Sequence, residues 1–287
     1  MTAKRAMKFV LMWIGLALLF NIGILVVEGQ EKALQFLGGY MIELSLSVDN
    51  LFVFLIIFSS FGVKQEYQRR ALNYGIFGAI ILRLVFILLG ITLVSKLEWI
   101  LYLFGIVLII SGFKMMFGHD KEKDYTHSKV LRILKKFIPV TDTMHGEKFF
   151  VRQNKVLYAT PLFAILLIIE SSDILFAIDS IPAIFSITTD PFIVYTSNIF
   201  AILGLRSLYF ALSALHEKFK YVKYGVGVIL MFTGVKLGIL FFGLHIPIVA
   251  SLITIFAILI GSVIVSLIVS KKEEKKKKEF ELKKVDL

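Results

Sequence analysis

Long apolar segments recur along the whole chain and are separated by shorter polar or basic ones. About 20 apolar residues suffice to cross a bilayer as a helix. Eight segments reach that length, near residues 9–27, 33–61, 72–94, 99–117, 157–187, 192–215, 221–242 and 247–270. An apolar content of 57% also excludes an ordinary soluble domain. The pattern predicts an all-α, polytopic membrane protein with about eight transmembrane helices.

Three motifs occur twice in the same order, which indicates an internal duplication. The pairs are 43–50 with 173–180, 77–83 with 200–206, and 105–114 with 227–236. Each copy has three spans, an odd number, so the second copy must enter the membrane from the opposite side. We therefore expect an inverted 3+3 repeat with one flanking helix at each end, an architecture found in secondary transporters.

The expected organisation has six parts. They are a cytoplasmic N-terminus and first helix (1–32), repeat 1 (33–117), a basic cytoplasmic loop (118–156), repeat 2 (157–243), a last transmembrane helix (244–270) and a disordered basic tail (271–287).

The basic residues lie mainly on one side of the predicted membrane. If the N-terminus is cytoplasmic, 26 of the 32 Lys and Arg residues fall in tails and loops on that side. Only Lys32 and Lys96 fall on the other side. This asymmetry is the positive-inside rule, and it predicts that both termini are cytoplasmic. The net charge of +11 thus reflects topology, and we expect membrane lipids rather than nucleic acid as partners.

Five carboxylates lie within predicted spans, where a charge is costly and indicates a function or a partner. They are Glu43, Asp49, Glu170, Asp173 and Asp179. Arg83 and Arg206 also lie within spans and are the candidates for balancing this charge. Two arginines cannot neutralise five acids, so at least three of the acids must be protonated, hydrated or bound to a cation. Structural ion pairing remains the alternative for any single acid.

Helical geometry bears on whether these acids meet. On a straight helix Asp49 points about 120° away from Glu43, so both reach one cavity only if the helix is locally unwound. Pro182 removes a backbone donor in the fifth span, which would free carbonyl groups to line a cavity. We therefore expect discontinuous helices around a shared site.

The available ligands are oxygens, from the acids, Asn50 and several serines. Oxygen ligands suit hard cations such as Mg²⁺, Ca²⁺ or Mn²⁺, whereas Zn²⁺ and Cu²⁺ usually involve His or Cys. The chain has no cysteine, and no histidine lies in the middle of a span. A hard divalent cation is the predicted ligand, and no permanently bound cofactor is expected.

The sequence also limits the energy source. It has no G-x-x-x-x-G-K-[ST] phosphate loop, so nucleotide hydrolysis is not expected. Exporting a divalent ion against a negative-inside potential costs about 4.6 kcal/mol per 100 mV, which requires coupling. Acids that exchange a metal ion for protons would supply it. An intramembrane aspartyl protease would also use paired Asp, but its Gly-x-Gly-Asp pattern is absent, so no enzyme activity is expected.

The long loop at 119–155 contains one further motif. Basic and apolar residues alternate at helical spacing over 129–138, which predicts an amphipathic helix on the anionic leaflet. Docking of a protein partner is the alternative. His119, His127 and His145 lack metal-ligand spacing and are expected to be solvated.

The segments 170–210, 43–50 and 145–150 closely resemble the TerC/Alx family of bacterial integral membrane proteins. The resemblance covers about residues 33–243. It implies a place in the LysE-like transporter superfamily, a historical link with tellurium resistance, and manganese export for several members. By position, it implies a metal site formed by Glu43, Asp49, Asn50, Asp173 and Asp179, with Glu170 beside them.

These observations together predict an exporter of Mn²⁺ in the bacterial inner membrane, working by alternating access and cation exchange. The alternative is a membrane scaffold that assists insertion, assembly or metal loading of exported proteins, with the 119–155 loop as its contact surface.

Overall fold

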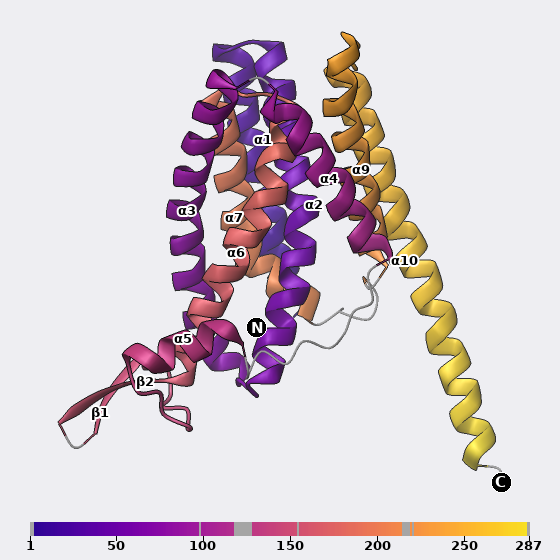
Figure 1. The fold of residues 1–287 in the computed structure, drawn as a ribbon. Coiled ribbons are helices and arrows are strands. Elements are labelled where there is room, and N and C mark those ends of the chain that lie inside the picture. Colours follow the sequence, from indigo (N-terminus) through magenta and orange to yellow (C-terminus); the bar gives the residue numbers. More distant parts are fainter. Residues whose placement is uncertain are drawn as a thin grey trace.

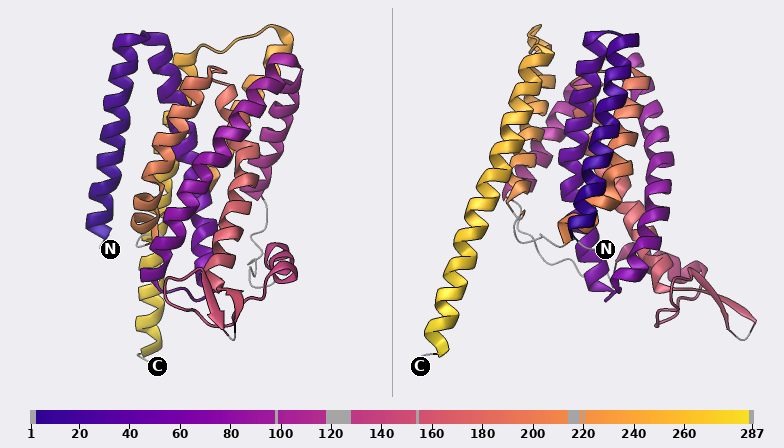
Figure 2. Two further views of the ribbon diagram at one scale, coloured as in Figure 1. Left: turned by 90° about the vertical axis from the view of Figure 1, so that its left-hand side faces the viewer. Right: turned by 180° about the vertical axis from the view of Figure 1, so that it is seen from behind.

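The computed structural model describes residues 3–97, 99–117, 128–153, 155–213, 219 and 221–285. Within these ranges the chain is almost entirely helical, and eight helices are long and apolar enough to cross a membrane. The protein is an all-α polytopic membrane protein, as predicted. The helices form one bundle, and both chain ends point toward the same end of it (Figures 1 and 2). We call this end the terminal face and the other end the opposite face.

The first half of the bundle contains four long helices. They are α1 (Ala3–Val27), α2 (Gln30–Ser60), α3 (Gln65–Lys96) and α4 (Ile100–Phe117). The second half contains α6 (Pro161–Phe185), α7 (Pro191–Ser213), α9 (Val222–Ile239), the short 3₁₀ helix η2 (Leu240–Phe242) and α10 (Ile248–Val285). α2, α3, α6 and α7 pack against one another and form the centre of the molecule.

Two large apolar clusters divide the centre of the bundle. One lies toward the terminal face and includes Phe54, Phe58, Leu162 and Tyr209. The other includes Ile42, Ile181, Ile184 and Val226 and extends toward the opposite face. The side chains of both clusters are buried within the bundle. The polar residues in the middle of α2, α3, α6 and α7 therefore lie between two apolar layers.

Two expectations about helix continuity were wrong. α2 runs without interruption from Gln30 to Ser60, and α6 runs from Pro161 to Phe185. Pro182 is inside α6 but falls in its last turn, where the missing N–H bond does not break the helix. Gly38 and Gly39 do not break α2 either; they allow close packing against Ile187 and Ser197.

α4 and α9 pack antiparallel through glycines. A Cβ atom at Gly105 would lie 2.8 Å from the carbonyl oxygen of Gly234, and one at Gly234 would lie 2.6 Å from that of Gly105. Gly112 and Gly227 face each other's carbonyl groups in the same way. Because 105–114 aligns with 227–236, these contacts are reciprocal under the proposed duplication. The inverted repeat stays a prediction, and this reciprocity is in keeping with it.

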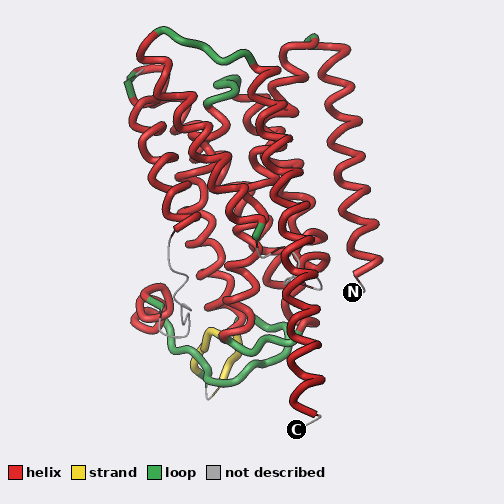
Figure 3. The backbone as a smooth tube through the Cα atoms, turned by 90° about the vertical axis from the view of Figure 1, so that its right-hand side faces the viewer, coloured by secondary structure: helices red, strands yellow, loops and turns green. Residues whose placement is uncertain are grey.

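The segment between the two halves forms a small unit at the terminal face (Figure 3). The predicted amphipathic helix is present as α5 (Lys129–Phe137), capped by the Ser128 side chain. A hairpin of β1 (Phe150–Gln153) and β2 (Val156–Ala159) follows, with Lys155 at a positive φ in its turn. This hairpin was not predicted. Part of the 119–155 loop, including His119 and His127, lies outside the described residues.

The C-terminal segment also differs from the prediction of a disordered tail. α10 continues as one helix from Ile248 to Val285 and extends well beyond the bundle (Figure 2). Lys and Glu, which dominate this segment, are good helix formers. A helix that begins in the apolar span can therefore continue through it without a break.

Candidate intramembrane carboxylate site

Arg83 of α3 lies at the centre of the candidate site and is 1% exposed. Its guanidinium forms ion pairs with Glu43 of α2 and with Asp173 of α6, the second at 3.5 Å. It also donates to Ser180 Oγ at 3.2 Å and to Asn198 Oδ1 at 2.6 Å. One buried cation thus connects α2, α3, α6 and α7. Glu43 and Asp173 occupy corresponding positions in the proposed repeat.

Asn198 of α7 is a site residue that sequence reasoning did not assign. It is fully buried, and its side-chain nitrogen donates to the Val194 carbonyl oxygen at 2.9 Å. This bond turns Oδ1 toward Arg83 and leaves it as an acceptor. The available signal was an amide side chain inside an apolar span, which needs a partner wherever water is excluded.

Glu170 lies about one turn before Asp173 on α6, so both side chains lie on the same side of the helix. Its carboxylate lies against Gly78 of α3. Glu170 Oε2 and Asp173 Oδ2 are buried and have no hydrogen-bond partner among the described residues. Glu43, Asp173 and Glu170 together carry two more negative charges than Arg83 offsets when all are ionised. Inside a membrane, such an excess of negative charge must be neutralised by protons or by a bound cation.

The structure does not bring all the predicted site residues together. Asp179 accepts a hydrogen bond from Ser111 of α4 at 2.7 Å, on another side of α6 from Asp173. Side chains six residues apart on a continuous helix point about 120° away from each other, which explains this separation. Asn50 is buried on α2, and Asp49 beside it is partly buried. Within the described residues, no three acidic or histidine side chains are arranged as a metal site.

Arg206 does not have the predicted place deep among the acids. Its side chain is exposed and donates to Asn73 Oδ1 at 2.7 Å. Asn73 lies near the start of α3, so Arg206 lies toward the terminal face rather than at the level of Arg83. Arg83 and Arg206 therefore differ in surroundings although the motifs around them align. The site has one buried arginine instead of two.

Access to the site is limited in this conformation. Asp173 borders a void of about 10 Å³, which is about enough for one water molecule. Its other walls are apolar side chains and backbone, with Leu72, Phe54 and Leu205 on the side of the terminal face. The structure thus shows the carboxylates in a closed arrangement between the two apolar layers.

The fold and these buried charges define a multi-pass integral membrane protein. Residues 28–275 match the model of the integral membrane protein TerC family, and the chain belongs to that family.

Several relatives are similar over nearly the full chain. The Escherichia coli K12 protein named "Putative membrane-bound redox modulator Alx" is 47% identical over 285 residues, 96% of this chain and 88% of that protein. The Myxococcus xanthus protein named "Uncharacterized membrane protein STKORF319" is 46% identical over 268 residues, 93% of this chain and 84% of that one. The Arabidopsis thaliana "Thylakoid membrane protein TERC, chloroplastic" is 45% identical over 266 residues, 93% of this chain and 69% of that one. No solved structure matches the chain.

Proposed function

We propose that this protein is a secondary transporter that exports a hard divalent cation, Mn²⁺, in exchange for protons. One observation carries the proposal: Glu43 and Asp173 share the single buried guanidinium of Arg83, and the carboxylate of Glu170 lies about one turn away on α6, with its buried Oε2 without a hydrogen-bond partner among the described residues. A structural ion pair needs equal numbers of charges, whereas this set has an excess of acids. Protons neutralise that excess in one state, and a divalent cation neutralises it in another.

Arg83 is the resting counter-ion in this mechanism. It occupies the place between Glu43 and Asp173, where carboxylates from the two proposed repeats approach each other. A divalent cation that binds both carboxylates must displace the guanidinium toward Ser180 and Asn198, which already accept hydrogen bonds from it. Release of the cation returns Arg83 to the acids. This exchange prevents the two carboxylates from being left without a counter-charge in the apolar interior.

The choice of ion rests on the ligand chemistry and on the family. The oxygen ligands suit Mn²⁺, Ca²⁺ and Mg²⁺ alike, and the family resemblance favours Mn²⁺. The Escherichia coli relative has the words "redox modulator" in its name, but this chain has no cysteine for thiol chemistry of its own. A redox effect would therefore be indirect. By the same proposal, the protein lies in the inner membrane with both termini cytoplasmic; a link with tellurium resistance follows only from the family name.

The direct test is transport in proteoliposomes that contain the purified protein. Mn²⁺ movement is measured with and without a proton gradient, with Ca²⁺ and Mg²⁺ as competitors. We expect Mn²⁺ transport that stops when the gradient is collapsed. Asp173→Asn and Glu170→Gln should each reduce the rate more than tenfold. Asp142→Asn, which changes an exposed acid outside the spans, is the matched control. If Asp173→Asn and Glu170→Gln both transported Mn²⁺ at the wild-type rate, the proposal would be wrong.

Asp49 and Asp179 need a separate test because Asp179 lies apart from Arg83. Asp49→Asn and Asp179→Asn are compared in cells by measuring total Mn, Ca and Mg with and without the protein. Loss of export would place these acids on the path of the ion. Normal export would make them structural and would leave the Arg83 cluster as the site.

A scaffold function is the second candidate, and α5 favours it. Phe137 is 85% exposed and Ile133 is 55% exposed on this helix, outside the bundle. Exposed aromatic and branched side chains of this kind are typical of protein contacts. The double change Ile133→Ser and Phe137→Ser separates the two functions. A transporter keeps its Mn²⁺ transport in proteoliposomes, whereas a scaffold loses its effect in cells.

A further inference from the structure

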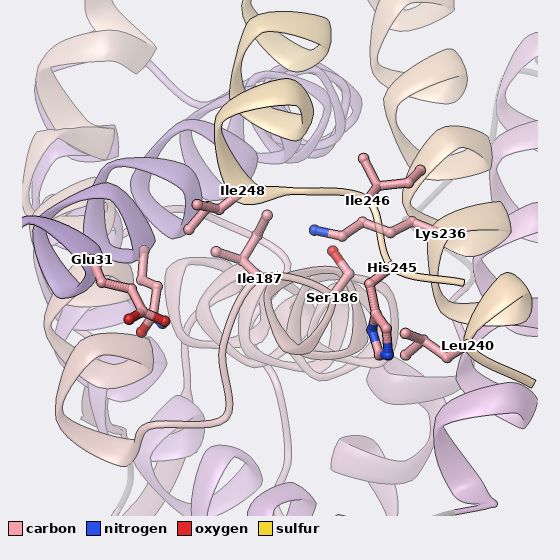
Figure 4. A pocket seen from close by; sticks show the side chains of 9 residues that line it. Glu31, Ser186, Ile187, Lys236, Leu240, His245, Ile246 and Ile248 are labelled. Atoms are coloured by element: carbon pink, nitrogen blue, oxygen red, sulfur yellow. The ribbon is translucent and has the colours of Figure 1, made fainter. Parts of the chain in front are cut away.

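A cavity of about 250 Å³ lies at the opposite face, remote from the carboxylate site. Its polar walls are formed by Glu31 and Gln35 of α2, Ser186 after α6, Lys236 of α9 and His245 in the loop before α10. Figure 4 shows Glu31 on one side of the cavity, with Lys236, Ser186 and His245 on the other. The function proposed above does not use this cavity.

Lys236 is the residue that points to a ligand. Its side chain is only 8% exposed, and it lines the cavity with its amine directed inward (Figure 4). Among the described residues, this amine has no ion-pair partner and no hydrogen-bond partner. Ser186 already donates its hydroxyl to the Ala183 carbonyl oxygen at 2.7 Å, so it offers the cavity an acceptor only. A buried ammonium without an acidic partner is costly unless a ligand supplies the negative charge.

Two further groups make this side of the cavity suitable for an oxyanion. His245 is a possible donor through its ring nitrogens. Ile248, the first residue of α10, also lines the cavity, and the first turn of α10 contains no acidic residue. The first N–H groups of a helix have no partner within it and carry partial positive charge. Lys236, His245 and the start of α10 thus favour a phosphate oxygen.

Glu31 distinguishes this cavity from a simple anion site. It lies on the other wall, and Gln35 donates to its Oε1 at 3.4 Å, which leaves Oε2 available. A purely anionic ligand would be repelled by this carboxylate. A ligand with a phosphate at one end and an ammonium at the other satisfies both walls.

We propose that this cavity binds a phosphate–ammonium zwitterion of the phosphoethanolamine type, with the phosphate at Lys236 and the ammonium at Glu31. The cavity lies at the ends of membrane-spanning helices, where the headgroup of a phospholipid is at the right depth. The same chemistry is offered by free phosphoethanolamine in solution. The two sources are distinguished by the experiment.

The full-length protein is placed in nanodiscs of phosphatidylglycerol, an anionic lipid without an ammonium group, with increasing fractions of phosphatidylethanolamine. Thermal unfolding is measured for wild type, Lys236→Gln and Glu31→Gln. We expect a saturable rise in melting temperature for wild type that each variant abolishes. Lys96→Gln changes an exposed lysine at the same face and should keep the full rise. Binding of a ligand to the folded state alone produces such a rise.

A second arm adds free phosphoethanolamine to pure phosphatidylglycerol nanodiscs. A rise that Glu31→Gln abolishes supports a soluble ligand, and no rise together with the lipid effect supports a headgroup. An equal lipid effect in wild type and both variants overturns the proposal. Loss of the effect in Lys236→Gln but not in Glu31→Gln also overturns it, because the site would then accept any anion. If Lys236→Gln does not fold, Glu31→Gln, at an exposed position, decides the result alone.

Discussion

Gly78 of α3 lies so close to the carboxylate of Glu170 on α6 that no side chain fits between them. A Cβ atom at Gly78 would overlap all three atoms of that carboxyl group. The absence of a side chain therefore gives Glu170 its place beside Asp173. A glycine inside a transmembrane helix here determines the position of an acid on its neighbour.

Gly78→Ala should displace Glu170 while leaving the fold intact. The overlapping atoms are at the end of a flexible side chain, which can rotate away, and alanine favours the helix by about 1 kcal/mol relative to glycine. We expect transport to fall to the level of Glu170→Gln, with a melting temperature no lower than that of wild type. Gly15→Ala, where the added Cβ meets no atom within 4 Å, is the control. Normal transport by Gly78→Ala would mean that Glu170 need not occupy this position.

Arg83→Gln should destabilise the protein strongly. Removing one partner of a buried ion pair typically costs about 3–5 kcal/mol, because the other charge remains buried without compensation. Glu43→Gln in the same chain should recover part of that loss, since it removes one of the uncompensated charges. Arg206→Gln, at an exposed position, should change stability by less than about 0.5 kcal/mol. Unfolding of all four proteins in detergent measures these differences. Equal effects of Arg83→Gln and Arg206→Gln would contradict the central role of Arg83.

The apolar pattern was sufficient to predict the transmembrane helices. The segment expected at 33–61 is α2, Gln30–Ser60, and the one expected at 157–187 is α6, Pro161–Phe185. The second prediction began too early because Val156–Ala159 is an apolar strand that pairs with Phe150–Gln153. A short apolar run has no helical or strand period of its own, so only its pairing distinguishes the two.

The candidate site could be predicted only in part. Intramembrane charges marked Glu43, Arg83 and Asp173 as residues in need of partners. Which acid meets which arginine depends on the rotation of each helix about its axis, and a single helix sequence does not contain that information. Hence Arg206 was expected beside the acids, and its hydrogen bond to Asn73 on another helix was not foreseen.

Asp190, just before α7, should make stability depend on pH. Burial raises its pKa, but Lys32 and the N–H groups of Ile193 and Phe192 outweigh that effect and lower the pKa below 3.8. A lowered folded-state pKa stabilises the fold above the unfolded-state pKa, and this stabilisation is lost as pH falls through the folded-state value. Asp190→Asn should therefore lower the melting temperature at pH 6. Between pH 6 and pH 3, the melting temperature of the variant should fall by less than that of wild type. Parallel curves for wild type and variant would contradict this.

Gly112→Ala tests the close packing of α4 against α9. The added Cβ would lie 2.5 Å from the Gly227 carbonyl oxygen, which is backbone and cannot rotate away. The two helices must separate, and overpacking of this kind typically costs about 1–3 kcal/mol. Gly238→Ala on α9, where the Cβ meets no atom within 4 Å, should instead be neutral or stabilising by up to about 1 kcal/mol. Thermal unfolding in detergent compares the two. Gly112 aligns with Gly234, and a Cβ at Gly234 would lie 2.6 Å from the Gly105 carbonyl oxygen. Gly234→Ala should therefore show the same loss, because under the proposed duplication the Gly234–Gly105 contact corresponds to the Gly112–Gly227 contact. A loss in only one of the two variants would argue against that correspondence.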